Sequence, residues 1–128
     1  MKPENKFKKK ILTKLTANTT PMELYLKRGV PDIYGFYDNG RCFWLEFKCS
    51  KMKKVNISPL QISWNYKHFI SSPNNFYIVE SQEARSFKLY EGNKGKELLL
   101  SGFLAPCIME LGFNEKDFLK LDNFLKFL

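Results

Sequence analysis

The sequence predicts an α/β or α+β domain in which a helix, strands, a second helix, further strands and a helical tail follow one another. Three observations predict this order: an apolar line at helical spacing near the N-terminus, two strand-like runs around a turn signal, and a helix start with Ser before Pro. The chain has 128 residues, 44% of them hydrophobic, and no internal repeat or Pro/Gly linker. We therefore expect a single domain, residues 1–128, with its own core.

The first helix is predicted over residues 3–15, because Pro suits a first helical turn and an apolar line follows it. That line consists of Phe7, Ile11 and Leu15. A weak alternation over residues 22–27 favours a short strand. The second helix is predicted from Pro59 to about Ile70, with Ser58 as its N-cap. The remaining pattern predicts a turn over 71–75, strands over 76–80 and 86–90, a loop over 92–95, and a last helix from residue 114.

A hairpin is predicted between strands at 31–37 and 41–49, because aromatic and β-branched residues flank Asp38-Asn39-Gly40. A two-residue loop would place Asp32 opposite Phe47. A three-residue loop, with Gly40 in the left-handed region, would place Asp32 opposite Glu46. The second register is favoured because it separates an apolar face from a charged one. The apolar face would carry Ile33, Phe43, Leu45 and Phe47, and the other face Asp32, Tyr34, Trp44, Glu46 and Lys48.

The net charge of +8 is unevenly distributed along the chain. Residues 1–70 carry 14 Lys or Arg and 5 Asp or Glu (+9), whereas residues 71–128 carry 7 and 8 (−1). This asymmetry favours a polyanion partner such as nucleic acid, although a solubility surface has the same composition. No apolar run reaches the roughly 20 residues of a membrane span. Three cysteines and one histidine fit neither a disulfide framework nor a zinc site, so we expect a reducing, intracellular compartment.

Two carboxylates opposite each other in a strand pair repel, so Asp32 and Glu46 would need a cation between them. Hard oxygen ligands suit Mg²⁺ or Mn²⁺, which also take phosphate oxygens. Lys48 shares their face and can orient a metal-bound water, so the set fits phosphodiester hydrolysis. The alternative is an ordinary surface hairpin, in which Asp32 caps a turn and Glu46 pairs with Lys48.

Three motifs occur in order: Arg28-Gly29-Val30-Pro31-Asp32, Trp44-Leu45-Glu46-Phe47-Lys48 and Ser58-Pro59-Leu60-Gln61. Together with a Glu early in the first helix, they resemble the PD-(D/E)XK nuclease superfamily. The most similar branch is that of the virus-type replication-repair nucleases (VRR-Nuc), which is also similar to archaeal-type Holliday junction resolvases. The resemblance covers residues 4–61. It implies a restriction-endonuclease-like α/β fold, with a mixed central sheet flanked by helices (an αβββαβ core) and a C-terminal helical tail.

The resemblance assigns roles to residues of the hairpin. Asp32 and Glu46 resemble the family's metal-binding carboxylates. Phe47 matches the residue whose backbone carbonyl completes the metal shell, which leaves its side chain free to pack in the core. Lys48 resembles the catalytic lysine. The implied cofactor is Mg²⁺ or Mn²⁺, and the implied activity is hydrolysis of DNA.

Two further matches have structural alternatives. Glu4 matches the first-helix glutamate, and it shares that helix's apolar stripe, where a carboxylate needs a partner such as a metal ion or its water. A Glu in a first turn also complements the helix dipole without any site role. Gln61 matches a glutamine that supports the catalytic site, but with Ser58 it also fits a capping box.

The implied substrate is branched DNA such as a four-way junction, and the implied assembly is a homodimer in the cytoplasm of a bacterial or phage-infected cell. The residues expected to contact DNA phosphates are Lys8, Lys9, Lys51, Lys53 and Lys54. The apolar tail, residues 98–128, either makes the dimer contacts or completes the core. Two other functions remain open: an unspecific or sequence-specific nuclease of phage or restriction type with the same fold, and a non-catalytic basic module that binds nucleic acid.

Overall fold

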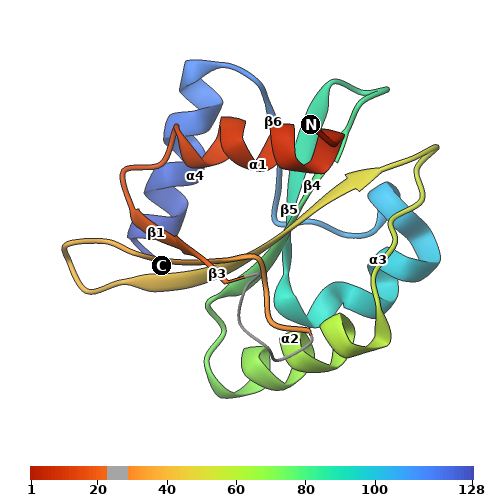
Figure 1. Ribbon diagram of the computed structural model, residues 1–128, viewed down its shortest axis with the longest axis horizontal. Coiled ribbons are helices and arrows are strands. Elements are labelled where there is room, and N and C mark those ends of the chain that lie inside the picture. Colours follow the sequence, from red (N-terminus) through yellow and green to blue (C-terminus); the bar gives the residue numbers. More distant parts are fainter. Residues whose placement is uncertain (23–28) are drawn as a thin grey trace.

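A mixed sheet organises the computed structural model, which describes residues 1–22 and 29–128 (Figure 1). The strands lie in the sheet in chain order, and all neighbours are antiparallel except β3 and β4. The strands are β1 (Asn18–Pro21), β2 (Ile33–Phe36), β3 (Cys42–Ser50), β4 (Asn75–Ser81), β5 (Ser86–Glu91) and β6 (Met109–Gly112). The helices are α1 (Pro3–Leu12), α2 (Pro59–Ser71), α3 (Gly95–Ser101) and α4 (Glu115–Lys126), with 3₁₀ turns at Gly92–Lys94 and Gly102–Leu104. The predicted α/β fold with a mixed, helix-flanked sheet is confirmed.

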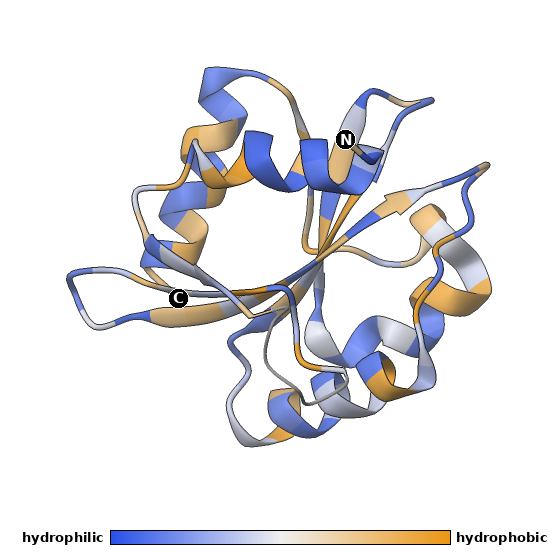
Figure 2. Cartoon of the chain, in the orientation of Figure 1, coloured by the Kyte–Doolittle hydropathy of each residue, from blue (hydrophilic) through white to orange (hydrophobic). Residues whose placement is uncertain are grey.

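The two faces of the sheet carry different helices (Figure 1). Parallel strands need a crossover connection, and α2 supplies it between β3 and β4. Together with α3, it covers one face, and α1 and α4 cover the other. Apolar residues line the central strands between these layers (Figure 2). The α1/α4 side buries Phe7, Ile11, Phe43, Leu45, Phe47, Phe118, Leu121 and Leu125, and the smaller α2/α3 side buries Val55, Ile57, Tyr77, Val79, Tyr90 and Leu98.

The hairpin of β2 and β3 has the three-residue loop and the register that its apolar alternation predicts. Tyr34 pairs with Trp44, the Tyr37 N–H donates to the Arg41 carbonyl at 2.8 Å, and Gly40 has φ 89°. The β2 strand is shorter than the predicted run of 31–37. Because side chains alternate along a strand, this register sends one set of β3 residues to each face.

The predictions for the outer elements differ from the structure. Helix α1 ends three residues early, because the Thr13 hydroxyl donates to the Lys10 carbonyl at 2.9 Å and the chain turns there. The strand predicted over 22–27 falls mainly outside the described residues, and β1 precedes it in a polar segment without alternation. The loop predicted over 92–95 was wrong in part, since α3 begins at Gly95. Strand β6 was missed because its short segment buries one apolar side chain, Leu111.

The C-terminal segment, residues 98–128, completes the core of its own chain. Its buried apolar side chains are Leu98, Phe103, Ala105, Leu111, Phe118, Leu121 and Leu125. Among residues 1–22 and 29–128, no helix combines the length and apolar character required to cross a bilayer.

Candidate active site

The predicted site lies where β3 continues past the end of β2. Pairing between these strands ends at Ile33 and Leu45, and Asp32 is the next residue along. The Phe47 N–H donates to the Asp32 Oδ2 at 3.0 Å, which fixes this carboxylate against the edge of β3. The Phe47 ring points to the other side of the strand and packs edge-on against Phe7 of α1, with ring centroids 5.5 Å apart. The prediction that Phe47 packs in the core is confirmed.

Glu46 is the most deeply buried carboxylate of this group, with 1% of its surface exposed. The Gln61 Nε2 donates to its Oε2 at 3.1 Å, and the Lys48 Nζ lies 3.7 Å from the same oxygen. The other oxygen, Oε1, has no hydrogen-bond partner within residues 1–22 and 29–128. Burial raises the pKa of Glu46 well above its ordinary value, and the negative charge of Asp32 raises it further, against the opposing charge of Lys48. A buried carboxylate with an unpartnered oxygen is costly, so it demands an explanation.

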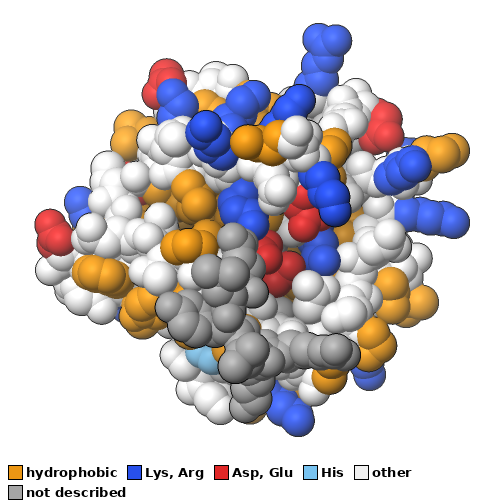
Figure 3. Space-filling model, in the orientation of Figure 1, with side chains coloured by type: hydrophobic (Ala, Val, Ile, Leu, Met, Phe, Trp, Pro, Cys, Tyr) orange, Lys and Arg blue, Asp and Glu red, His pale blue; other side chains and the backbone are white. Residues whose placement is uncertain are grey.

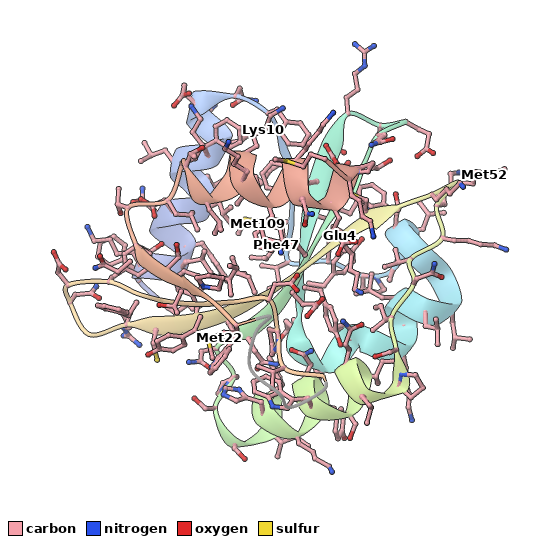
Figure 4. The ribbon with its side chains drawn as sticks, in the orientation of Figure 1. Glu4, Lys10, Met22, Phe47, Met52 and Met109 are labelled. Atoms are coloured by element: carbon pink, nitrogen blue, oxygen red, sulfur yellow. The ribbon has the colours of Figure 1, made fainter. Side chains whose placement is uncertain are left out.

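Glu4 approaches the same segment from α1. Figure 4 shows it at the start of this helix, near the point where the helix passes over β3. Its side chain is half-buried, and burial raises its pKa; the charge of Asp32 acts in the same direction, while Lys48 opposes it. The stripe residues Phe7 and Ile11 are buried, and Glu4 precedes Phe7 by about one helical turn.

Gln61 both caps helix α2 and contacts the buried carboxylate of Glu46. Its Oε1 accepts from the Ser58 N–H at 3.1 Å, and its own N–H donates to the Ser58 hydroxyl at 3.2 Å, so the capping box is present. At the same time, its Nε2 donates to Glu46. The cap therefore orients the side-chain amide so that its donor group faces the buried carboxylate.

Tyr77 and Trp64 join this region although no motif singled them out. Tyr77 pairs with Glu46 across the parallel strands, is fully buried, and its hydroxyl donates to the Gln61 carbonyl at 3.4 Å. Its pKa is raised by burial and by the negative charge of Glu46. Trp64 packs against Trp44 at 5.3 Å between ring centroids, which holds α2 on β3. In the sequence, the only indication of this role is that the Tyr77 hydroxyl is the one polar side-chain group in the apolar run of residues 76–79.

One of the candidate DNA-binding lysines, Lys8, lies near the carboxylates. Lys8 lies close enough to Glu4 and Glu46 for its positive charge to oppose the rise in the pKa of both carboxyls. Figure 3 shows acidic side chains in the middle of this face with Lys and Arg side chains around them. The exposed members of the predicted set are Lys9, Lys51, Lys53 and Lys54.

The arrangement fits a hard divalent cation, with one restriction. Asp32 and Glu46 supply two carboxylates, the negative charge of Asp32 raises the pKa of Glu46, and the Glu46 Oε1 lacks a donor among the described residues. In the same part of the chain, however, no three His, Cys, Asp or Glu side chains stand close enough to form a metal site. Glu4 therefore does not close a three-carboxylate set, and a cation here would need backbone oxygen or water as well. Mg²⁺ is bound in this way, through one or two carboxylates and several waters.

Comparison of the chain with protein-family models, with curated proteins and with solved structures finds no match. The interpretation of the site therefore depends on its own residues and geometry.

Proposed function

We propose that this chain is a Mg²⁺- or Mn²⁺-dependent DNA endonuclease of the restriction-endonuclease-like fold, acting on branched DNA such as four-way junctions. One observation carries the proposal: Glu46 is buried beside Asp32 and Lys48 with an oxygen that lacks a donor among residues 1–22 and 29–128. The order of α1, three strands, the crossover helix α2 and β4 agrees with the core that the motif resemblance implies.

The divalent ion would supply charge withdrawal from the phosphate and a more acidic water. Asp32 and Glu46 would hold it, with the Phe47 carbonyl completing the shell and Glu4 acting through water. The Phe47 N–H keeps Asp32 in place, and Gln61 fixes one oxygen of Glu46, so the other stays directed at the site. Lys48, whose Nζ lies 3.7 Å from the Glu46 Oε2, would orient the attacking water and stabilise negative charge on the phosphate.

The substrate class rests on charge and on the motifs. The +9 balance of residues 1–70 lies in the half of the sequence that supplies Asp32, Glu46 and Lys48, which favours a polyanion substrate. Preference for branched DNA comes from the motif resemblance.

The decisive experiment incubates the purified protein with a labelled four-way junction and a linear duplex of the same sequence, with and without Mg²⁺. We expect Mg²⁺-dependent cleavage that is faster on the junction and is lost in Asp32→Ala and Lys48→Ala. Asp38→Ala is the matched control, because Asp38 is an exposed acid in the same hairpin. Equal cleavage of both DNAs would instead favour an unspecific nuclease. Binding that ignores both Mg²⁺ and Lys48→Ala would favour the non-catalytic module.

A homodimer would allow paired cuts on a symmetric junction. The C-terminal segment keeps several apolar side chains exposed: Leu99, Leu100, Leu104, Leu119 and Phe127. Analytical ultracentrifugation of the free protein measures the oligomeric state directly.

A further inference from the structure

The turn between β3 and α2 presents an apolar side chain among lysines. Lys51 and Lys54 close the turn through two backbone hydrogen bonds of 2.9 Å. Met52, with φ 50°, and Lys53, with φ 69°, adopt left-handed conformations that are unfavourable for residues with long side chains. Met52 is 79% exposed, and Figure 4 shows it at the outer end of the turn, away from the body of the molecule.

Contacts on both sides hold this turn in place. The Met52 N–H donates to the Glu83 Oε1 at 3.2 Å, and the other Glu83 oxygen accepts from the Ser81 hydroxyl at 3.2 Å. The Phe103 N–H donates to the Lys53 carbonyl at 2.8 Å. Gly102 approaches that carbonyl so closely that a Cβ at this position would collide with it. The turn is therefore a fixed projection, and its unfavourable conformation is maintained by the surrounding structure.

Packing does not explain this projection. Met52 belongs to neither of the two apolar cores of the sheet, and its neighbours in the chain, Lys51 and Lys53, are cationic. Proteins that deform DNA insert an apolar side chain between base pairs while flanking cations contact the phosphates. A rigid turn carrying Met52 between Lys51 and Lys53 has both features, and Lys54 adds a third positive charge.

We propose that Met52 is a wedge that enters a base step of bound DNA and unstacks it, while Lys51, Lys53 and Lys54 hold the adjacent phosphates. The proposal rests on DNA being the substrate of the site. It also predicts where the wedge enters. The strand residues from Phe47 to Ser50 and the turn residue Lys51 separate Glu46 from Met52, so at about 3.3 Å per residue the two Cα atoms lie at most about 20 Å apart. With about 3.4 Å per base step, the unstacked step lies no more than about six base pairs from the cleaved bond.

The experiment places 2-aminopurine, whose fluorescence rises when it is unstacked, at successive positions of the DNA. It is performed in the Asp32→Ala background, so that the DNA stays intact, under conditions in which binding is saturated. We expect a fluorescence rise within about six base pairs of the wild-type cleavage site. Met52→Ala should lose this rise while its dissociation constant stays within about tenfold of the parent. Met52→Leu should keep it.

Leu100→Ala is the matched control, since Leu100 is equally exposed and apolar but lies on α3 without the lysine flanks. It should leave the fluorescence rise unchanged. A rise that survives in Met52→Ala, or bound DNA that shows no rise, would overturn the wedge. A rise in a protein that never cleaves DNA with Mg²⁺ would overturn the nuclease proposal and leave the wedge standing. Absence of DNA binding would overturn both.

Discussion

Two buried carboxylates, on opposite faces of the sheet, have opposite surroundings. Asp122 of α4 is 5% exposed, and both of its oxygens are hydrogen-bonded. Its Oδ1 accepts from the Thr16 N–H at 3.0 Å and from the Tyr37 hydroxyl at 2.7 Å, and its Oδ2 accepts from the Thr16 hydroxyl at 2.8 Å. Glu46 is even more deeply buried, yet its Oε1 lacks a partner in the described part of the chain.

The difference shows that burial alone does not determine whether a carboxylate has its hydrogen bonds satisfied. Asp122 joins three segments that are distant in sequence, and the donors around it compensate for its lost hydration. The Glu46 Oε1 has no donor among the described residues, and two further carboxylates lie nearby, so the charged form of Glu46 is unfavourable in the folded protein. On the proposed function, a cation bound at this site would explain why Glu46 is not an apolar residue or a better satisfied one.

The strongest test of this comparison is Glu46→Gln. If Glu46 holds a divalent ion, the neutral amide should lower the rate of DNA cleavage at least about 1,000-fold, equivalent to about 4 kcal/mol. The same change removes a poorly compensated buried charge, so the free energy of unfolding at neutral pH should stay the same or rise. Cleavage assays and urea unfolding measure the two effects. A large loss of stability would show that Glu46 is structural after all.

Asp122→Ala should have the converse result. It removes three hydrogen bonds and leaves the buried Tyr37 hydroxyl with a weaker partner, so we expect the protein to lose about 3 kcal/mol of stability. Cleavage per folded molecule, measured well below the unfolding temperature, should be unchanged. Loss of cleavage in a fully folded sample would contradict the division of roles between the two carboxylates.

The local pattern around Glu46 was predictable because it depends on neighbours in sequence. Alternation along residues 41–49 and the Asp38-Asn39-Gly40 turn determine the register that brings Asp32 to the edge of β3. The cap at Ser58 likewise determines where Gln61 points. Both features follow from spacing and turn chemistry within a few residues.

The surroundings of Asp122 were not predictable in the same way. Its partners are 106 and 85 residues away, and nothing in a single sequence links them. Helix α3 and strand β6 were missed for a related reason, since short segments take their structure from tertiary packing more than from periodicity. The absence of a third metal-ligating side chain near Asp32 among the described residues also depends on three-dimensional placement.

The pH dependence of the free energy of unfolding tests whether the charged form of Glu46 is poorly compensated. Its pKa is raised above the ordinary value of 4.5, so between that pH and the raised pKa the native state binds more protons than the unfolded chain. Stability of the wild type should therefore fall as the pH rises through this window, and the raised pKa of Glu4 adds to the fall. Glu46→Gln lacks the larger contribution, so its urea midpoint should exceed that of the wild type increasingly as the pH rises.

Mg²⁺ should offset the loss of stability at higher pH in the wild type, but not in Glu46→Gln. At a concentration of about 100 times its dissociation constant, an ion that binds the native state adds about 2.7 kcal/mol. The urea midpoint of the wild type at neutral pH should therefore rise with Mg²⁺, and that of Glu46→Gln should not. Equal responses would place the ion elsewhere in the molecule.

The smallest effects should come from separating the two contacts of Gln61. Ser58→Ala removes the hydroxyl that caps α2 and should cost about 1 kcal/mol of stability with little change in cleavage, because the amide can still reach Glu46. Gln61→Glu keeps an acceptor for the Ser58 N–H but replaces the donor at Glu46 with a negative charge. At acidic pH, Gln61→Glu should lower the free energy of unfolding less than Ser58→Ala does. It should also reduce the rate of DNA cleavage more than Ser58→Ala does. If both variants reduced cleavage equally, the site would depend on the position of the α2 N-terminus, and the amide contact with Glu46 would be incidental.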